Sequence, residues 1–120
     1  MSRKIEIKIL SEMEIKKEIK RMSDRVMSGL VFNKNTVVMT PEVFAQIFSQ
    51  KRLELLEFLR KTGAISVSEL ARSLNRRFEV VYRDLKKFES YGFVRLIKQK
   101  RTVVPELVGE LVVKIAAVHG

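Results

Sequence analysis

One stretch, residues 66–104, constrains the fold of this chain more than any other: SVSELARSLNRRFEVVYRDLKKFESYGFVRLIKQKRTVV. Ser66 opens a Ser-Val-Ser-Glu capping box, which predicts a short helix. Asn75 follows, and asparagine tolerates the left-handed backbone of a sharp turn. A longer amphipathic helix is predicted from about Arg77 to Tyr91, and Gly92 ends it. The segment therefore predicts two helices joined by a tight turn.

A basic hairpin is predicted directly after these helices. Residues 93–98 and 102–107 are rich in β-branched and apolar side chains, and they flank Gln99-Lys100-Arg101. Pro105 restricts part of the second strand to a sheet edge. Helix, turn, helix and hairpin in this order predict a winged helix-turn-helix. The predicted fold class is α+β.

The rest of the chain predicts an extension of this domain. Ile5, Ile7 and Ile9 alternate with charged residues as in a half-buried strand. Ser11 opens a second capping box, which predicts a helix from Glu12 to about Ser28. The predicted divisions are a strand–helix–strand extension (1–40, its second strand at 36–39), the winged helix-turn-helix domain (41–107), and a C-terminal strand and tail (108–120).

Two further helices are predicted at the start of the central domain. Thr40-Pro41-Glu42 begins the first, because proline is favoured at the first helical position. The second spans residues 50–61 and ends at Gly63. The residues of the second helix expected to face inward are Leu53, Leu55, Leu56, Phe58 and Leu59.

An apolar stripe on the predicted N-terminal helix has the spacing of a coiled coil. Its members are Ile15, Ile19, Met22 and Val26. Packing against its own domain explains so short a stripe equally well. Binding at a membrane surface is a third interpretation, which the four acidic residues between 11 and 34 oppose. Our hypothesis is homodimerisation through this helix together with the N-terminal strand and the C-terminal strand at 110–116.

The charge is concentrated on the predicted helices and hairpin. The chain has a net charge of +10, and residues 70–101 carry ten basic and three acidic side chains, or +7. Such a balance favours a polyanionic partner, with nucleic acid ahead of anionic lipid.

The sequence lacks the parts of a catalytic or metal site. There are no cysteines, two aspartates and one histidine, His119, next to the C-terminus. No glycine-rich phosphate loop is present. We therefore expect no enzyme, no metal and no cofactor. The absence of cysteine, of a signal peptide and of a long apolar run predicts a cytoplasmic protein that does not bind a membrane.

Phasing the helix at 77–91 separates an inward face from an outward face. Val81, Leu85 and Phe88 fall together with Phe78 beside them, and Asp84 lies near this buried side, where we expect it to pair with an arginine such as Arg60 or Arg72. The predicted DNA contacts from the recognition helix are Arg76, Arg77, Glu79, Tyr82, Arg83, Lys86 and Lys87. The predicted wing contacts are Lys98, Lys100 and Arg101, and the predicted contacts to the DNA backbone are Ser68 and Arg72.

Residues 44–105 resemble the archaeal MarR-like winged-helix transcriptional regulators. The resemblance rests on an Arg-Leu helix start, on ISVSELARSLNR and on VVYRDLKKFESYG. It implies a homodimer on pseudo-palindromic double-stranded DNA, with Arg76, Arg77, Tyr82 and Arg83 on or beside the recognition helix and Lys100 and Arg101 in the wing. Two alternatives stay open: a protein-interaction winged helix, such as a toxin partner or a transcription-machinery component, and a nonspecific architectural DNA-binding protein.

Overall fold

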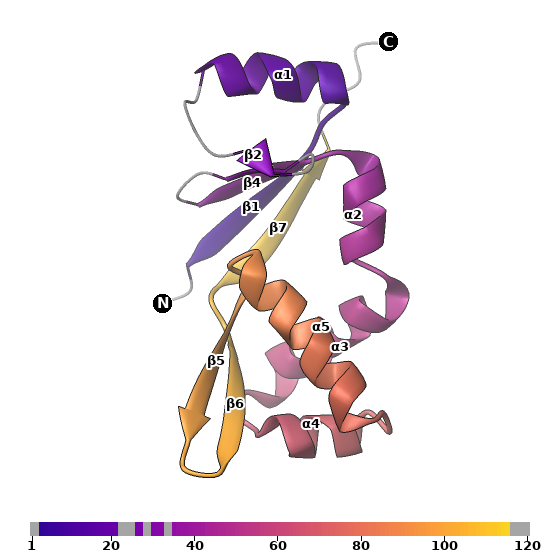
Figure 1. Ribbon diagram of the computed structural model, residues 1–120, viewed down its shortest axis with the longest axis vertical. Coiled ribbons are helices and arrows are strands. Elements are labelled where there is room, and N and C mark those ends of the chain that lie inside the picture. Colours follow the sequence, from indigo (N-terminus) through magenta and orange to yellow (C-terminus); the bar gives the residue numbers. More distant parts are fainter. Residues whose placement is uncertain (1–2, 22–25, 28–29, 33–34, 116–120) are drawn as a thin grey trace. The chain divides into compact units, whose positions relative to one another are not determined.

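The chain folds into two compact units of mixed α and β structure (Figure 1). The computed structural model describes residues 3–21, 26–27, 30–32 and 35–115. The sheet unit contains residues 1–49 and 110–120, and the helix–hairpin unit contains Gln50–Gly109. This grouping differs from the predicted divisions at residues 40 and 107, because the first central helix and the C-terminal strand belong with the N-terminal part.

The sheet unit is built on a mixed five-stranded sheet in the order β2-β3-β4-β1-β7. Strand β1 lies in the middle and runs parallel to both β4 and β7, whereas β2, β3 and β4 are antiparallel neighbours. The elements of this unit are β1 (Lys4–Ile9), α1 (Glu12–Arg21), β2 (Val26–Met27), β3 (Leu30–Phe32), β4 (Thr36–Met39), α2 (Pro41–Ile47) and β7 (Glu110–Ile115).

The alternating isoleucines of β1 form one apolar face of this sheet. Ile7 pairs with Val37 of β4 and Val113 of β7, and neighbours in register share a face. Ile7 is fully buried and Val37 nearly so. On the other face, Ile15 of α1 packs against the buried Val38. The predicted strand at residues 5–9 is confirmed.

Helix α1 begins as predicted and ends earlier than predicted. The Glu14 amide donates to Ser11 Oγ at 3.2 Å, and the Ser11 amide donates to Glu14 Oε1 at 3.1 Å, which completes the capping box. The helix ends at Arg21, and Val26 lies in β2, so the predicted helix to Ser28 is wrong.

The helical stripe proposed for dimerisation is therefore not present as predicted. Ile15 is buried inside its own unit and is not available to a second chain. Val26 is in a strand rather than on the helix. Ile19 lies in α1, but its side chain is outside the described part of the chain, as is all of Met22. Packing against its own domain is the interpretation that Ile15 supports.

The helix–hairpin unit contains three helices and a two-stranded antiparallel hairpin (Figure 1). Its elements are α3 (Gln50–Thr62), α4 (Val67–Ser73), α5 (Phe78–Ser90), β5 (Val94–Gln99) and β6 (Thr102–Leu107). Its buried side chains come from all three helices, from the start of the hairpin and from β6: Leu55, Leu56, Leu59, Val67, Leu70, Ala71, Val81, Leu85, Phe88, Phe93, Val94 and Pro105. Leu53, which was predicted to face inward, is instead 48% exposed.

Candidate nucleic-acid interface

Helix α4 and the turn after it fix where α5 begins. Ser66 Oγ accepts from the Glu69 amide at 3.1 Å, and the Ser66 amide donates to Glu69 Oε1 at 3.2 Å, as the capping box predicts. At the other end Asn75 is left-handed with φ of 55°. The Asn75 and Arg76 amides donate to the carbonyls of Arg72 and Ala71, which is a Schellman ending.

The rotation of helix α5 about its own axis is fixed, because one of its faces is buried in the core of the unit. Val81, Leu85 and Phe88 have no exposed surface. Gly92, with φ of 83°, ends the helix, and the Phe93 amide donates to the Phe88 carbonyl at 3.0 Å while the two rings pack at 6.4 Å. This ending is also of the Schellman type, with its usual hydrophobic contact. The residues opposite this face must therefore point outward.

The outward face of α5 carries four of the predicted contacts. Glu79, Arg83, Lys86 and Lys87 are all exposed. Lys86 donates to Glu89 at 3.0 Å, and this hydrogen bond raises the pKa of the Lys86 ammonium. Within the described residues, Arg83 and Lys87 have no ion pair. They are the two cations of this helix that remain available to a polyanion.

Arg76 and Arg77 are neighbours in sequence but differ in placement. The Arg76 side chain is only 10% exposed, and it donates to Glu54 Oε1 at 2.8 Å and to the Lys51 carbonyl at 2.9 Å. Arg76 thus binds the α4–α5 turn to α3 and does not join the outward face. Arg77 is 86% exposed, with its Nε 4.0 Å from Glu79 Oε1.

Asp84 has the structural role that was predicted, with a different partner. Its carboxylate accepts from Arg52 Nε at 3.0 Å, and both side chains are mostly buried. The predicted pairing with an arginine is confirmed, but the two arginines named are wrong, because Arg60 binds Glu57 on its own helix and Arg72 is exposed. The pair Arg52–Asp84 connects α3 to α5.

The first turn of α5 exposes apolar side chains whose exposure was not predicted. Phe78 is 43% exposed, so its predicted place on the buried face is wrong, and Val80 is 37% exposed. The Phe78 ring stacks on Tyr82 with centroids 5.7 Å apart and planes 9° apart. Tyr82, a predicted contact, is therefore half-buried beside Phe78. The four-residue spacing of Phe78 and Tyr82 in the sequence is the signal that could have predicted this contact, because residues four apart are neighbours on a helix surface.

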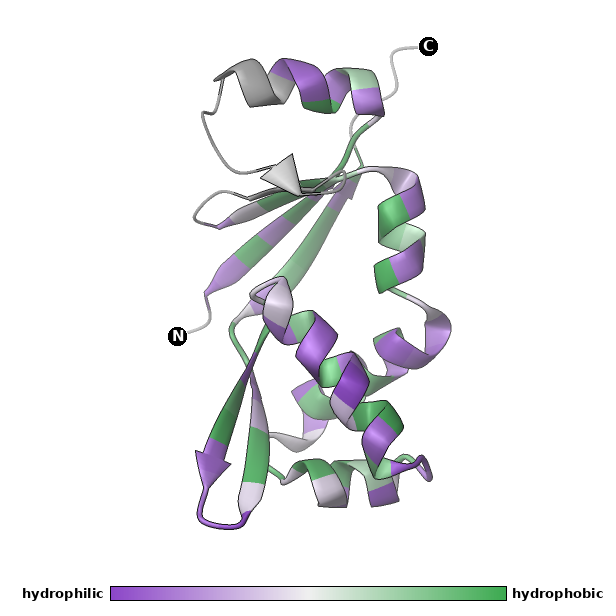
Figure 2. Ribbon diagram, viewed as in Figure 1, coloured by the Kyte–Doolittle hydropathy of each residue, from purple (hydrophilic) through white to green (hydrophobic). Residues whose placement is uncertain are grey.

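The hairpin of β5 and β6 exposes the three predicted wing residues at its tip. Lys98, Lys100 and Arg101 are exposed, and Figure 2 shows the hydrophilic tip below the apolar bands of both strands. Gln99 pairs with Thr102, so Lys100 and Arg101 form a two-residue turn. Lys100 has φ of 52°, a conformation that costs a residue with a side chain about 1–2 kcal/mol.

A family model described as HVO_A0114 matches residues 47–112, which include the whole helix–hairpin unit. The match covers more than half of the 120 residues. The chain belongs to the HVO_A0114 family. A comparison with curated proteins found no match.

The HVO_A0114 match contains every predicted contact of the helices and the hairpin. Ser68 and Arg72, predicted to contact the DNA backbone, are exposed on α4 in this region. The predicted dimerisation stripe at residues 15–26 lies outside it. The family description does not name the MarR-like regulators, so that finer resemblance stays a prediction.

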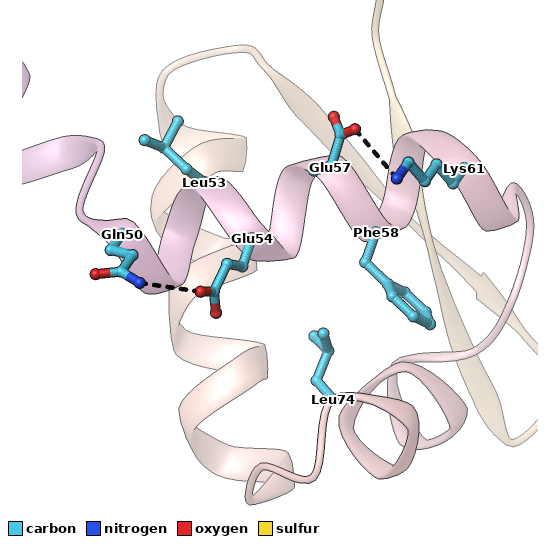
Figure 3. Close-up of a pocket in the computed structure, with 7 residues that line it drawn as sticks. All are labelled: Gln50, Leu53, Glu54, Glu57, Phe58, Lys61 and Leu74. Carbon is cyan, nitrogen blue, oxygen red and sulfur yellow. Dashed lines mark hydrogen bonds and ion pairs between the residues drawn. The ribbon is translucent and has the colours of Figure 1, made fainter.

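A shallow groove on α3 of this HVO_A0114 family member has a different chemistry (Figure 3). Its lining residues are Gln50, Leu53, Glu54, Glu57, Phe58, Lys61 and Leu74. Gln50 donates to Glu54 at 3.3 Å, and Lys61 lies 3.6 Å from Glu57. Two carboxylates and one lysine, already paired, are a poor site for a polyanion.

The described part of this HVO_A0114 family member brings together no group of three or more metal-ligating side chains of the His, Cys, Asp and Glu types. Over the same residues, no helix has both the length and the apolar character needed to cross a membrane.

Proposed function

We propose that the helix–hairpin unit is a winged helix-turn-helix that binds double-stranded DNA. Helix α5 is the recognition helix and lies in the major groove, which admits an α-helix. The β5–β6 tip is the wing and contacts the adjacent backbone or minor groove. The three helices and the hairpin follow one another in the order that such a domain requires.

A single observation carries this proposal: among the described residues, two of the three exposed cations of α5 and all three at the hairpin tip have no ion pair, whereas two of the three exposed cations of α3 are paired. Within the described residues, Arg83, Lys87, Lys98, Lys100 and Arg101 make no ion pair. On α3, Arg60 and Lys61 share Glu57, at 2.7 and 3.6 Å. An unpaired surface cation is free to bind a phosphate and release a counterion.

The individual roles follow from position along α5. Arg83 lies at the centre of the outward face, where a long donor reaches guanine O6 and N7. Lys86 and Lys87 lie nearer the end of the helix, where phosphates are the expected partners. Arg77 flanks the start of α5, and the exposed Ser68 and Arg72 of α4 contact the backbone. We assign Arg76 to structure rather than to DNA, because its guanidinium is occupied by α3.

We also propose that the biological role is that of a MarR-like transcriptional regulator. The support is the sequence resemblance over residues 44–105 and the unpaired cations. The alternative roles are those of a protein-interaction domain and of a nonspecific architectural protein. A DNA-binding experiment distinguishes both from a sequence-specific regulator.

The experiment is selection of duplex DNA from a random pool, followed by titration of the selected and a scrambled duplex over a range of salt. Arg83→Ala is expected to lower affinity for the selected duplex and to relax base preference. Lys100→Ala is expected to weaken both duplexes alike and to reduce the salt slope by about 1. Arg60→Ala removes an arginine that Glu57 already pairs, so it is the matched control and leaves binding unchanged.

Each competing outcome has a distinct signature. Failure to enrich any sequence, with a steep salt slope, indicates the architectural alternative. No salt-dependent binding at all overturns DNA binding and favours a protein partner.

We propose further that the chain acts as a homodimer through the edge of β7, which among the described residues pairs with β1 alone. Val113 is 44% exposed and Ile115 74% exposed at this edge of the sheet. An antiparallel pairing of two β7 strands about Val112 places Glu110 opposite Lys114 of the second copy and Leu111 opposite Val113. The strand is thus self-complementary in both charge and hydropathy, as an isologous interface requires.

Sedimentation of the purified chain tests this interface. Val113→Lys is expected to give a monomer, and Glu110→Lys is expected to weaken the dimer because it faces Lys114. Glu57→Lys, on α3 of the other unit, is the charge-matched control. A wild-type chain that sediments as a monomer at micromolar concentration contradicts the dimer.

A further inference from the structure

We propose that the first turn of α5 recognises thymine methyl groups through Phe78 and Val80, so that bound sites carry thymine at fixed positions. This inference rests on the proposed function and names the chemistry of its ligand. It assigns specificity to residues other than the predicted polar contacts.

The first turn of α5 departs from the pattern of the rest of the helix. Further along, apolar side chains are buried, as Val81, Leu85 and Phe88 are. In the first turn, Phe78 and Val80 leave 43% and 37% of their surface exposed. The recognition helix of a helix-turn-helix contacts base edges with its N-terminal residues. The exposed apolar surface is thus at the end of α5 that meets the bases.

The two side chains are fixed in place by their neighbours on the helix. Phe78 stacks on Tyr82 one turn later, at 5.7 Å and nearly parallel, which limits the motion of the ring. Val80 is β-branched and has one preferred rotamer in a helix. It lies three residues before Arg83 and therefore on the same side. A rigid apolar side chain next to a long hydrogen-bond donor fits a step between two base pairs better than a mobile side chain does.

Thymine is the base that such a surface selects. Its C5-methyl is the apolar group that base edges present in the major groove, and it is contacted by apolar side chains. Glu79, 70% exposed between Phe78 and Val80, is repelled by phosphates and so favours placement of this turn against base edges.

Charge argues for DNA over a protein partner for this surface. Residues 70–101 carry a net charge of +7. The exposed Arg77 and Arg83 lie on either side of Phe78 and Val80 in sequence. Apolar side chains next to the unpaired Arg83 and the exposed Arg77, whose Nε lies 4.0 Å from Glu79, complement a polyanion with apolar groups on its edges, which describes a thymine-containing groove.

The test replaces each thymine of the selected duplex by uracil, one position at a time. Uracil keeps every hydrogen-bonding group and lacks only the methyl. Binding is expected to weaken about fourfold at each contacted position, the effect of exposing one buried methyl. Val80→Ala and Phe78→Ala are each expected to lose the thymine preference at one position. Lys87→Ala, the control, weakens thymine and uracil duplexes alike.

The outcomes separate this inference from the proposed function. If wild-type protein binds the selected duplex with a steep salt slope and no uracil substitution changes affinity, thymine recognition is overturned and DNA binding stands. If no salt-dependent binding occurs, DNA binding itself fails. Phe78→Leu keeps an apolar side chain and guards against a folding defect, because it is expected to keep more of the thymine preference than Phe78→Ala.

Discussion

Helices α3 and α5 have the same length, but their net charges rank them as DNA-binding helices in a different order from their unpaired cations. Each has 13 residues, and α3 carries four basic and two acidic side chains whereas α5 carries three of each. By net charge α3 is the better DNA-binding helix. The count of unpaired cations gives the opposite order: among the described residues, α3 leaves one exposed cation without an ion pair, Lys51, and α5 leaves two, Arg83 and Lys87.

The pairing shows how this reversal arises. Glu57 neutralises Arg60 and Lys61 on its own helix, and Glu54 accepts from Arg76. On α5, Asp84 is turned inward to Arg52 and Glu89 binds Lys86, which leaves Arg83 and Lys87 unpaired. What a helix offers to a polyanion is therefore its unpaired cations and not its sum of charges.

The largest expected effect, on stability, comes from truncating a side chain on the buried face that fixes the rotation of α5 about its axis. Phe88→Ala is expected to lower the free energy of unfolding by about 3–5 kcal/mol, because it opens a cavity at a fully buried ring. Chemical denaturation measures it. Ser90→Ala, exposed on the same helix, is the control, and an equal effect of both would contradict a fixed α5.

Alanine substitutions of Arg76 and Arg77 test whether the buried arginine stabilises the fold while the exposed arginine binds DNA. Arg76→Ala is expected to destabilise the chain by about 2 kcal/mol, since it removes the hydrogen bonds from this guanidinium to Glu54 Oε1 and to the Lys51 carbonyl. Arg77→Ala is expected to leave stability unchanged and to weaken DNA binding. Thermal melts and binding titrations on both variants decide. The opposite assignment would show that Arg76 is released from α3 when DNA binds.

The glutamates of the two helices give a sharper comparison with a smaller effect. Glu79→Gln removes a negative charge from the outward face of α5 and is expected to strengthen DNA binding by about 1 kcal/mol. Glu57→Gln unpairs two cations on α3 and is expected not to change binding to the selected duplex. A gain for Glu57→Gln equal to that for Glu79→Gln would place α3 in the interface as well.

The smallest effect is a titration. The hydrogen bond from Arg60, with the charges of Arg60 and Lys61, lowers the pKa of Glu57 below 4.5. A lowered folded pKa means that the contribution to stability is complete above pH 4.5 and is lost as the pH falls through the folded value. NMR is expected to show Glu57 titrating below pH 4.5, and Arg60→Ala is expected to move it upward. A midpoint that Arg60→Ala does not change would mean that the pair does not form in solution.

Local signals predicted much of the helix–hairpin unit. The Ser66 capping box, the left-handed Asn75 and the helix end at Gly92 are confirmed, because each depends on residues a few positions apart. The hairpin strands agree with their predicted places within about one residue for the same reason.

Long-range contacts were the limit of sequence-based prediction. The spacing of residues 15, 19, 22 and 26 fits a helix, but Val26 pairs with Val31 in a sheet whose other strands lie elsewhere in the chain. Likewise, the link from Arg76 to α3 and the partner of Asp84 depend on how helices pack. Phe78 falls on the apolar side by phase alone, yet 43% of its surface is exposed.

The parallel pairing of β1 with β7 has a consequence for biosynthesis. Lys4 pairs with Glu110, more than 100 residues later, so the central strand gains one of its two neighbours only after those residues have been synthesised. The helix–hairpin segment emerges from the ribosome complete while β1 still lacks that neighbour. Closing so long a loop is entropically slow. We therefore expect nascent chains to display a folded helix–hairpin unit first, with the sheet completed only after β7 has emerged.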